Sequence, residues 1–134
     1  MAPKILVADD QLHMLRFMQH ELEQEGYQLL QARNGHEVVE MGLRERPDLM
    51  ILDILMPGMD GLAALRQLKR EQITRSIPVI VLTSSPHEVM RQEAEFSGAN
   101  LILTKPFSPT LLRKEVRRLV SKSRPDGTQP VHCS

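Results

Sequence analysis

Short apolar runs alternate with longer amphipathic stretches from the start of the chain almost to its end. The apolar runs have the length of strands and lie at residues 5–8, 27–30, 49–52, 79–82 and 101–103. Four of the five are almost continuously apolar, as expected of strands that are buried on both faces of a sheet. Each run is followed by a stretch of helical periodicity, so five strand–helix pairs predict a parallel sheet with right-handed crossovers and helices on both faces. The pattern therefore predicts a doubly wound α/β fold.

Residues that begin or end helices support this pattern. The first helical stretch places four apolar residues on one face and is followed by Gly26 as a stop signal: Leu12, Leu15, Met18 and Leu22. The third, fourth and fifth stretches each open with a residue suited to cap a helix: Asp60, Ser85 before Pro86, and Ser108 before Pro109.

Length and composition limit the remaining possibilities. The chain has 134 residues, of which 41% are apolar, and this fits one globular domain over residues 1–120 with a polar tail or linker start at 121–134. Seventeen basic residues balance seventeen acidic ones, so there is no net charge to attract nucleic acid or an anionic membrane. The single cysteine, Cys133, has no partner for a disulfide within the chain. Without a signal-like or spanning segment, we expect a cytoplasmic protein that does not insert into membranes.

Polar residues follow four of the predicted strands. They are Asp9, Asp10, Asp53, Thr83 and Lys105. Because ligands of doubly wound sheets sit outside the carboxyl ends of the strands, these five side chains should meet on one rim. Three carboxylates there suit a divalent cation such as Mg²⁺, which would offset the repulsion between the two adjacent aspartates. A lysine and a hydroxyl beside them are usual partners of phosphoryl oxygens, so the rim is predicted to be a phosphorylation site.

Four segments, "VADD", "LMILDILMPGMDG", "VIVLTSS" and "LILTKPF", resemble in their order and spacing the receiver domain of bacterial response regulators in two-component signalling. The resemblance covers about residues 3–120. It implies the flavodoxin-like strand order 2-1-3-4-5. It also implies a signalling switch that catalyses its own phosphorylation, rather than a conventional enzyme.

The resemblance assigns roles to the acidic residues. Asp53 is implied to accept a phosphoryl group from a sensor histidine kinase or a histidine phosphotransfer protein. Asp10 is implied to bind Mg²⁺ together with Asp53 and the backbone carbonyl of Leu55, with help from Asp9 through water.

The other rim residues are implied to act on the bound phosphoryl group. Lys105 would neutralise its oxygens and precede a cis peptide bond to Pro106, and Thr83 would form a hydrogen bond to it. The expected downstream partner is an effector protein or output domain, with a phosphorylation-dependent homodimer as a further option. The donor is expected to dock on the first helix, at His13, Met14 and Phe17, and on Pro106–Phe107.

Two positions depart from the family pattern. Members usually carry tyrosine or phenylalanine three residues before the lysine, whereas this chain has Ile102, which puts the aromatic part of the output switch in doubt. Leu55 replaces a polar residue that orients water in some receivers, so we expect slow spontaneous loss of the phosphoryl group.

Simpler interpretations apply to several of the polar residues. Either Asp9 or Asp10 could cap the first helix, and we expect one of them to do so in addition to its role at the rim. The five histidines, at positions 13, 20, 36, 87 and 132, are interpreted as surface residues. A basic run in and after the last helix is interpreted as a solvated face rather than a nucleic-acid site: Arg113, Lys114, Arg117, Arg118, Lys122 and Arg124.

Two other functions remain as alternatives. A phosphohydrolase of the haloacid dehalogenase type also forms an aspartyl phosphate, but it normally has an acidic residue where Leu55 stands, and no cap domain fits in this chain. A degenerate receiver that binds partners without being phosphorylated is disfavoured because all five rim residues are present.

Overall fold

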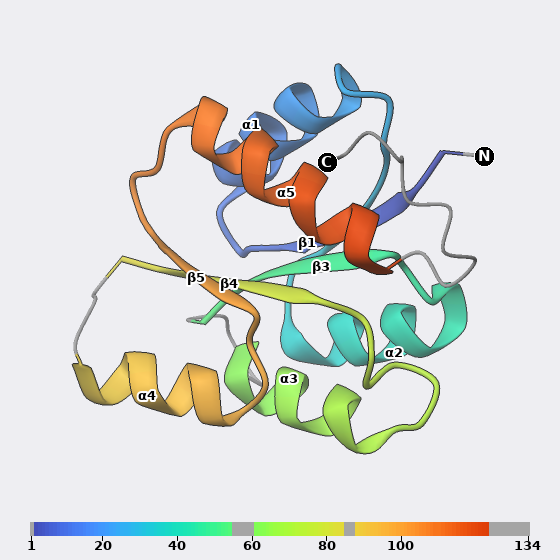
Figure 1. The fold of residues 1–134 in the computed structure, drawn as a ribbon, viewed down its shortest axis with the longest axis vertical. Helices are drawn as coiled ribbons and strands as arrows, with labels where there is room; N and C mark the ends of the chain where they lie inside the picture. Colours follow the sequence, from blue (N-terminus) through green and yellow to red (C-terminus); the bar gives the residue numbers. More distant parts are fainter. Residues whose placement is uncertain (1, 55–60, 85–87, 124–134) are drawn as a thin grey trace.

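The computed structural model describes residues 2–54, 61–84 and 88–123. Its centre is a five-stranded parallel sheet in the order β2-β1-β3-β4-β5, with the strands β1 (Lys4–Ala8), β2 (Gln28–Ala32), β3 (Leu49–Asp53), β4 (Val79–Thr83) and β5 (Leu101–Thr104) (Figure 1). The predicted doubly wound fold and its strand order are confirmed.

Helices cover both faces of the sheet. They are α1 (Leu12–Glu23), α2 (Gly35–Glu45), α3 (Gly61–Arg70), α4 (Glu88–Phe96) and α5 (Pro109–Ser123). In Figure 1, α1 and α5 lie on one side of the strands, and α2, α3 and α4 lie on the other. None of the helices in the described part of the chain is long and apolar enough to cross a membrane.

The sheet divides the hydrophobic core into two layers. Ile5 and Val7 of β1 belong to the cluster formed with α1 and α5, whereas Leu6 and Ala8 belong to the cluster formed with α2 and α3. Every residue of β3 and β4 is buried. The continuous apolar runs in the sequence are explained by this burial, because neighbouring residues of a strand point to opposite faces.

The first helix differs from its prediction at its start. Leu15, Met18 and Leu22 are buried as expected, but the side chain of Leu12 is 45% exposed. The N-cap is Gln11, so the prediction that Asp9 or Asp10 caps α1 was wrong. The Asp9 carboxylate instead accepts a hydrogen bond from the backbone N–H of Gln11 at 2.9 Å. This hydrogen bond closes a turn, and the helix begins after it.

The other helix starts have different outcomes. Ser108 caps α5 as predicted, because its hydroxyl accepts a hydrogen bond from the backbone N–H of Leu111 at 3.0 Å. Asp60 and Ser85–Pro86 lie outside the described residues. The start of α2 was not predicted from the sequence. It is capped by Asn34, whose side chain accepts a hydrogen bond from the Glu37 N–H. Helix α5 continues through Ser123, three residues past the boundary expected at 120.

Candidate functional site

The predicted rim lies at the carboxyl edge of the sheet. The ends of the strands are level with one another, because Ala8 pairs with Leu52, Asp53 with Leu82, and Thr83 with Thr104. The residues that end or follow β1, β3, β4 and β5 therefore reach the same edge, as the sequence predicted.

Three carboxylates converge there. One ligand oxygen from each of Asp9, Asp10 and Asp53 lies within 4.8 Å of the others. Asp9 is fully buried and Asp53 is 6% exposed, whereas Asp10 is exposed. The backbone of Asp9 is fixed by its N–H, which donates to the carbonyl of Ala32 at 3.2 Å. The buried Asp9 therefore fixes the inner side of the cluster, and the exposed Asp10 lies on its solvent side.

Lys105 lies between two of these carboxylates. Its Nζ is 2.8 Å from Asp9 Oδ2 and 3.3 Å from Asp53 Oδ2. Burial alone would lower the pKa of Lys105, but the hydrogen bond to Asp9 and the charges of Asp53 and Asp9 outweigh burial and raise it above 10.5. The backbone N–H of Lys105 donates to the carbonyl of Thr83 at 2.7 Å, and the cis Lys105–Pro106 bond implied by the resemblance is present.

The charges of the cluster do not cancel. Three ionised carboxylates and one ammonium leave a local excess of negative charge, part of it in a buried setting where screening is weak. Hard oxygen donors grouped in this way fit Mg²⁺. The carbonyl of Leu55, the fourth predicted ligand, lies outside the described residues.

Thr83 and Gly61 lie on the elements next to Asp53. Thr83 is the last residue of β4 and is 5% exposed. Gly61 begins α3 and packs onto the backbone of Asp53. Its N–H donates to the carbonyl of Ile54 at 3.0 Å, and a Cβ on Gly61 would overlap the carbonyl oxygen of Asp53. The Asp-Gly pair of "MDG" was the available signal.

Several apolar residues near the rim pack against the core and are only partly exposed to solvent. The rings of Phe17 and Phe107 are in contact, with centroids 6.0 Å apart, and both pack with Met14 against the α1–α5 side of the core. Met14 and Phe17 are therefore not simple surface residues, although both remain partly exposed. Leu12 and Leu111 are more open, at 45% and 38% exposure.

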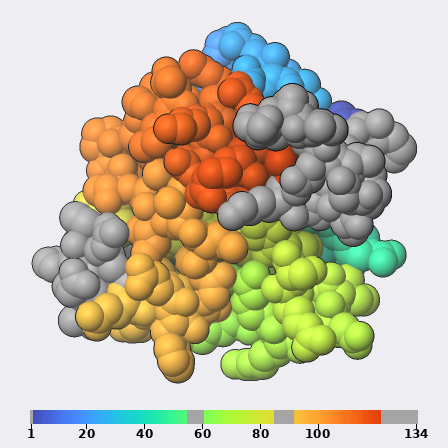
Figure 2. Space-filling model, viewed as in Figure 1, coloured from blue at the N-terminus to red at the C-terminus, as the bar shows by residue number. Residues whose placement is uncertain are grey.

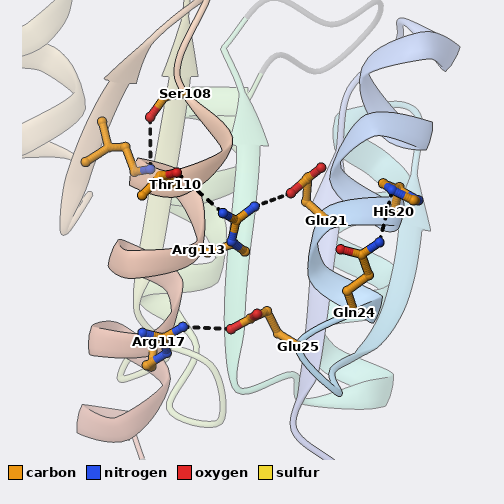
Figure 3. A network of polar contacts seen from close by, with 9 residues as sticks. His20, Glu21, Gln24, Glu25, Ser108, Thr110, Arg113 and Arg117 are labelled. Carbon is orange, nitrogen blue, oxygen red and sulfur yellow. Dashed lines mark hydrogen bonds and ion pairs between the residues drawn. The ribbon is translucent and has the colours of Figure 1, made fainter.

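The basic run of α5 is largely exposed, as predicted, but two of its arginines also pair with acidic residues of the α1 region. Arg113 forms an ion pair with Glu21 of α1, and Arg117 lies 2.8 Å from Glu25, which follows that helix (Figure 3). Lys114 is exposed, as are His13, His20 and His36. Lys122 belongs to the end of α5, whereas Arg124, His87 and His132 lie outside the described residues.

Ile102 occupies the position where the aromatic residue was expected. Its side chain is partly buried and packs against the core cluster on the α2–α3 side of the sheet. An isoleucine in that place is a packing residue of the edge strand β5.

Comparison with known proteins gives one family. Residues 5–117 match the family model described as the response regulator receiver domain. The protein PilH of Pseudomonas aeruginosa is 35% identical over 118 residues, which cover 88% of this chain and 98% of PilH.

Longer relatives and solved structures agree with this match. The alkaline phosphatase synthesis transcriptional regulatory protein PhoP of Bacillus subtilis is 32% identical over 92% of this chain, which spans only 50% of PhoP. The receiver domain of the sensor histidine kinase PA1611 from Pseudomonas aeruginosa superposes with a TM-score of 0.84 at 26% identity. That comparison covers 90% of this chain and 98% of the domain, whose structure contains a magnesium ion coordinated in the active-site cleft.

Proposed function

The chain belongs to the response regulator receiver domain family, a signalling component of two-component systems, and from this premise we propose that Asp53 is its phosphorylation site. The observation that carries the proposal is the position of Lys105, which bonds both Asp53 and the fully buried Asp9 within a three-carboxylate cluster. Neither the phosphohydrolase nor the degenerate receiver is favoured by the relatives that the chain matches.

Asp53 is the carboxylate best suited to act as nucleophile. A carboxylate oxygen of Asp53 attacks phosphorus, the P–N bond of the donor phosphohistidine breaks, and the bonding electron pair stays on the imidazole nitrogen, which is then protonated from solvent. Lys105 already lies 3.3 Å from Asp53, so its ammonium can pair with the oxygens of the incoming phosphoryl group. Asp9 holds the lysine in that place through the 2.8 Å contact.

The acidic cluster is the proposed Mg²⁺ site. Asp10 and Asp53 would supply ligands to the metal, with Asp9 acting through water and the Leu55 carbonyl as a further ligand. Bound Mg²⁺ would supply positive charge, without which three carboxylates repel an anionic phosphoryl group. PA1611, the similar receiver with a magnesium ion in its cleft, supports this assignment.

Thr83 is proposed to communicate phosphorylation to the rest of the domain. It ends β4, and its carbonyl is bonded to the backbone of Lys105, so a movement of Thr83 toward a phosphoryl oxygen would also affect the start of the β5–α5 loop. Ile102 is half-buried on β5. Because isoleucine has no ring, it cannot provide the ring rotation expected of an aromatic residue at this position.

The proposed donor is a sensor histidine kinase or a histidine phosphotransfer protein in the cytoplasm, and the proposed target is an effector protein or output domain. A homodimer that forms on phosphorylation is part of the same proposal. Direct binding of nucleic acid is not proposed, because two of the α5 cations are neutralised by acidic residues of α1 and the turn after it.

The proposal is tested by the mass of the intact protein after incubation with acetyl phosphate. Wild-type protein should gain one phosphoryl group in Mg²⁺ and none in chelator, because the cluster needs a cation to admit the anion. Asp53→Asn should not be labelled, and Glu40→Gln, which removes an exposed carboxylate of α2, should be labelled normally. Equal labelling of wild type and Asp53→Asn would refute the assignment.

The role of Thr83 needs a separate measurement. Thr83→Ala should still accept the phosphoryl group, but beryllofluoride should then change amide hydrogen exchange in α4 and β5 less than it does in the wild type. An unchanged exchange response would remove Thr83 from the switch while leaving Asp53 as the acceptor.

A further inference from the structure

The helices α3 and α4 lie side by side and are tied together by Arg66. Its Nε donates to the hydroxyl of Ser97 at 3.1 Å, and its guanidinium is 3.6 Å from the Glu93 carboxylate. Two hollows of about 540 and 270 Å³ adjoin this tie, and both are lined by Arg66, Phe96 and Ser97. Figure 2 shows α4 in yellow and orange beside α3 in green along the lower part of the molecule. We call the two hollows together the α3–α4 groove.

Phe96 is an unusual side chain to find at this place. It ends α4 and is 94% exposed, whereas the next most exposed large apolar residue among those whose side chains the structure describes is Ile73, at 54%. Its neighbours Ala94 and Ser97 are buried. Burying a phenylalanine ring of this kind removes apolar surface from water, so a partner that covers it gains affinity. An apolar group of a partner could therefore pack on this ring.

The α3 side of the groove is positively charged. Helix α3 has three basic residues and no acidic one: Arg66, Lys69 and Arg70. All three line the smaller hollow, which has no acidic lining residue. Lys69 and Arg70 form no ion pair with any carboxylate of the residues that the structure covers. The groove thus combines an exposed ring with an excess of positive charge.

The wall of the groove is held in place by Lys69. Its ammonium donates to the backbone carbonyls of Arg75 and Ile77 at 3.0 and 2.8 Å, and burial lowers its pKa. Its methylene groups pack on Gly98, where a Cβ would lie 3.0 Å from Lys69 Cγ. Because the wall is already ordered, a ligand would lose little free energy in ordering it.

The groove also lies away from the phosphorylation site. Helix α3 begins with Gly61 beside Asp53, and at 1.5 Å per residue Arg70 is about 13 Å further along the helix axis. Phe96 ends α4 just before the chain enters β5 at the opposite edge of the sheet. A ligand in the groove would not cover the acidic cluster.

We propose that the α3–α4 groove binds an acidic segment of a partner protein, which packs an apolar side chain on Phe96 and places carboxylates beside Arg66 and Arg70. Charge complementarity selects this occupant over a basic segment, and the apolar anchor distinguishes it from a free anion. The groove contains no residue of the phosphorylation site, so the unphosphorylated protein binds the segment.

The test uses two sets of short synthetic peptides and the unphosphorylated full chain. Both sets carry phenylalanine or leucine at the centre, flanked by aspartate and glutamate in one set and by lysine and arginine in the other. Acidic peptides should bind and shift the amide resonances of Arg66–Arg70 and Gln92–Gly98. Added salt should weaken the binding of these peptides. Phe96→Ser and Arg70→Glu should each weaken binding by about fivefold or more, which corresponds to about 1 kcal/mol.

Matched variants on the other face of the sheet serve as controls. Arg16→Glu reverses an exposed charge on α1, and Leu111→Ala removes an exposed apolar group on α5, so neither should alter binding. The proposal would be overturned if the basic peptides bound as tightly as the acidic ones. It would also be overturned if neither groove variant changed the affinity for the acidic peptides. A dimer that forms without peptide and is lost in Phe96→Ser would overturn it as well, because the groove would then be occupied by a second copy.

Discussion

Gly61 packs directly against the backbone carbonyl of Asp53, and its own N–H is bonded to the next carbonyl, that of Ile54, at 3.0 Å. The first residue of α3 thereby fixes the end of β3, where the proposed nucleophile stands. A Cβ on residue 61 would lie 2.9 Å from the carbonyl carbon of Asp53, which is closer than real Cβ atoms approach. This contact requires a glycine at position 61.

Replacing Gly61 with alanine should disturb both stability and chemistry. Overpacking of this kind is expected to lower the free energy of unfolding by about 2–3 kcal/mol and, because it moves Asp53, to slow labelling by acetyl phosphate. Gly26→Ala is the control: Gly26 has a φ of 91°, with no atoms within 4 Å of an added Cβ. That change should cost about 1 kcal/mol from backbone strain alone and leave the labelling rate intact. Equal labelling rates for the two variants would contradict the role of Gly61.

Removing the lysine should destabilise the protein at neutral pH. In Lys105→Met the fully buried Asp9 loses its ammonium partner, and Asp53 loses a charge that offsets the cluster. Breaking a buried pair from one side costs about 3 kcal/mol, measured by urea unfolding.

The same contact predicts a dependence on alkaline pH. Because folding raises the pKa of Lys105 above its usual 10.5, its stabilisation is complete below that pH and is lost as the pH rises through the folded pKa. The wild type should therefore lose stability above about pH 10.5 more steeply than Lys105→Met. Parallel curves for the two proteins would show that the ammonium does not stabilise the fold.

Magnesium should bind more tightly when the lysine is absent. Lys105 competes for oxygens of Asp9 and Asp53, so Lys105→Met removes an ammonium that pairs with two of the three carboxylates. Isothermal titration should give a lower dissociation constant for Mg²⁺ in this variant and one raised about tenfold in Asp10→Asn, since removing one carboxylate ligand weakens a hard-cation site. Because Asp10 is exposed, Asp10→Asn should fold as stably as the wild type without metal. Unchanged affinity in Asp10→Asn would remove Asp10 from the metal site.

Much of this arrangement is predictable from sequence because it rests on periodicity. Buried parallel strands need continuous apolar runs, and level strand ends bring Asp9, Asp53 and Lys105 together without further information. Contacts that depend on close backbone approach have no such pattern, which is why the sequence did not identify the contact between Gly61 and Asp53. Leu12 has the spacing of the core stripe but lies in the first turn of α1, where its side chain remains 45% exposed. The exposure of Phe96 likewise depends on how α4 sits on the sheet.

The two ion pairs between α5 and the α1 region should differ in strength. The side chains of Arg113 and Glu21 are 29% and 15% exposed, whereas Arg117 is 64% exposed beside Glu25. A double-mutant cycle with Arg113→Met and Glu21→Gln should give a coupling energy of about 1 kcal/mol. The corresponding cycle for Arg117 and Glu25 should give no measurable coupling at physiological salt, where exposed charges are screened. A stronger coupling in the Arg117 pair would reverse this ranking.

A phosphoryl donor should dock on exposed apolar residues beside the acidic cluster. Phe17 is a poor residue to test, because Phe17→Asp would break its contact with Phe107 and expose part of the core. Leu12 and Leu111 are better suited: both are exposed, and they lie in the first turns of α1 and α5, which begin at the carboxyl edge of the sheet beside the acidic cluster.

Leu12→Asp and Leu111→Asp should each slow phosphotransfer from a histidine kinase or phosphotransfer protein that labels the wild type. We expect a decrease of about tenfold, equal to about 1.4 kcal/mol, because a charged side chain replaces an apolar contact of the docked protein. Labelling by acetyl phosphate should not change, since a small donor needs no docking surface. Ile73→Asp is the matched control, because this exposed apolar residue lies between α3 and β4, at the other edge of the sheet. If Ile73→Asp slows phosphotransfer as much as the two rim variants do, the donor does not dock on α1 and α5.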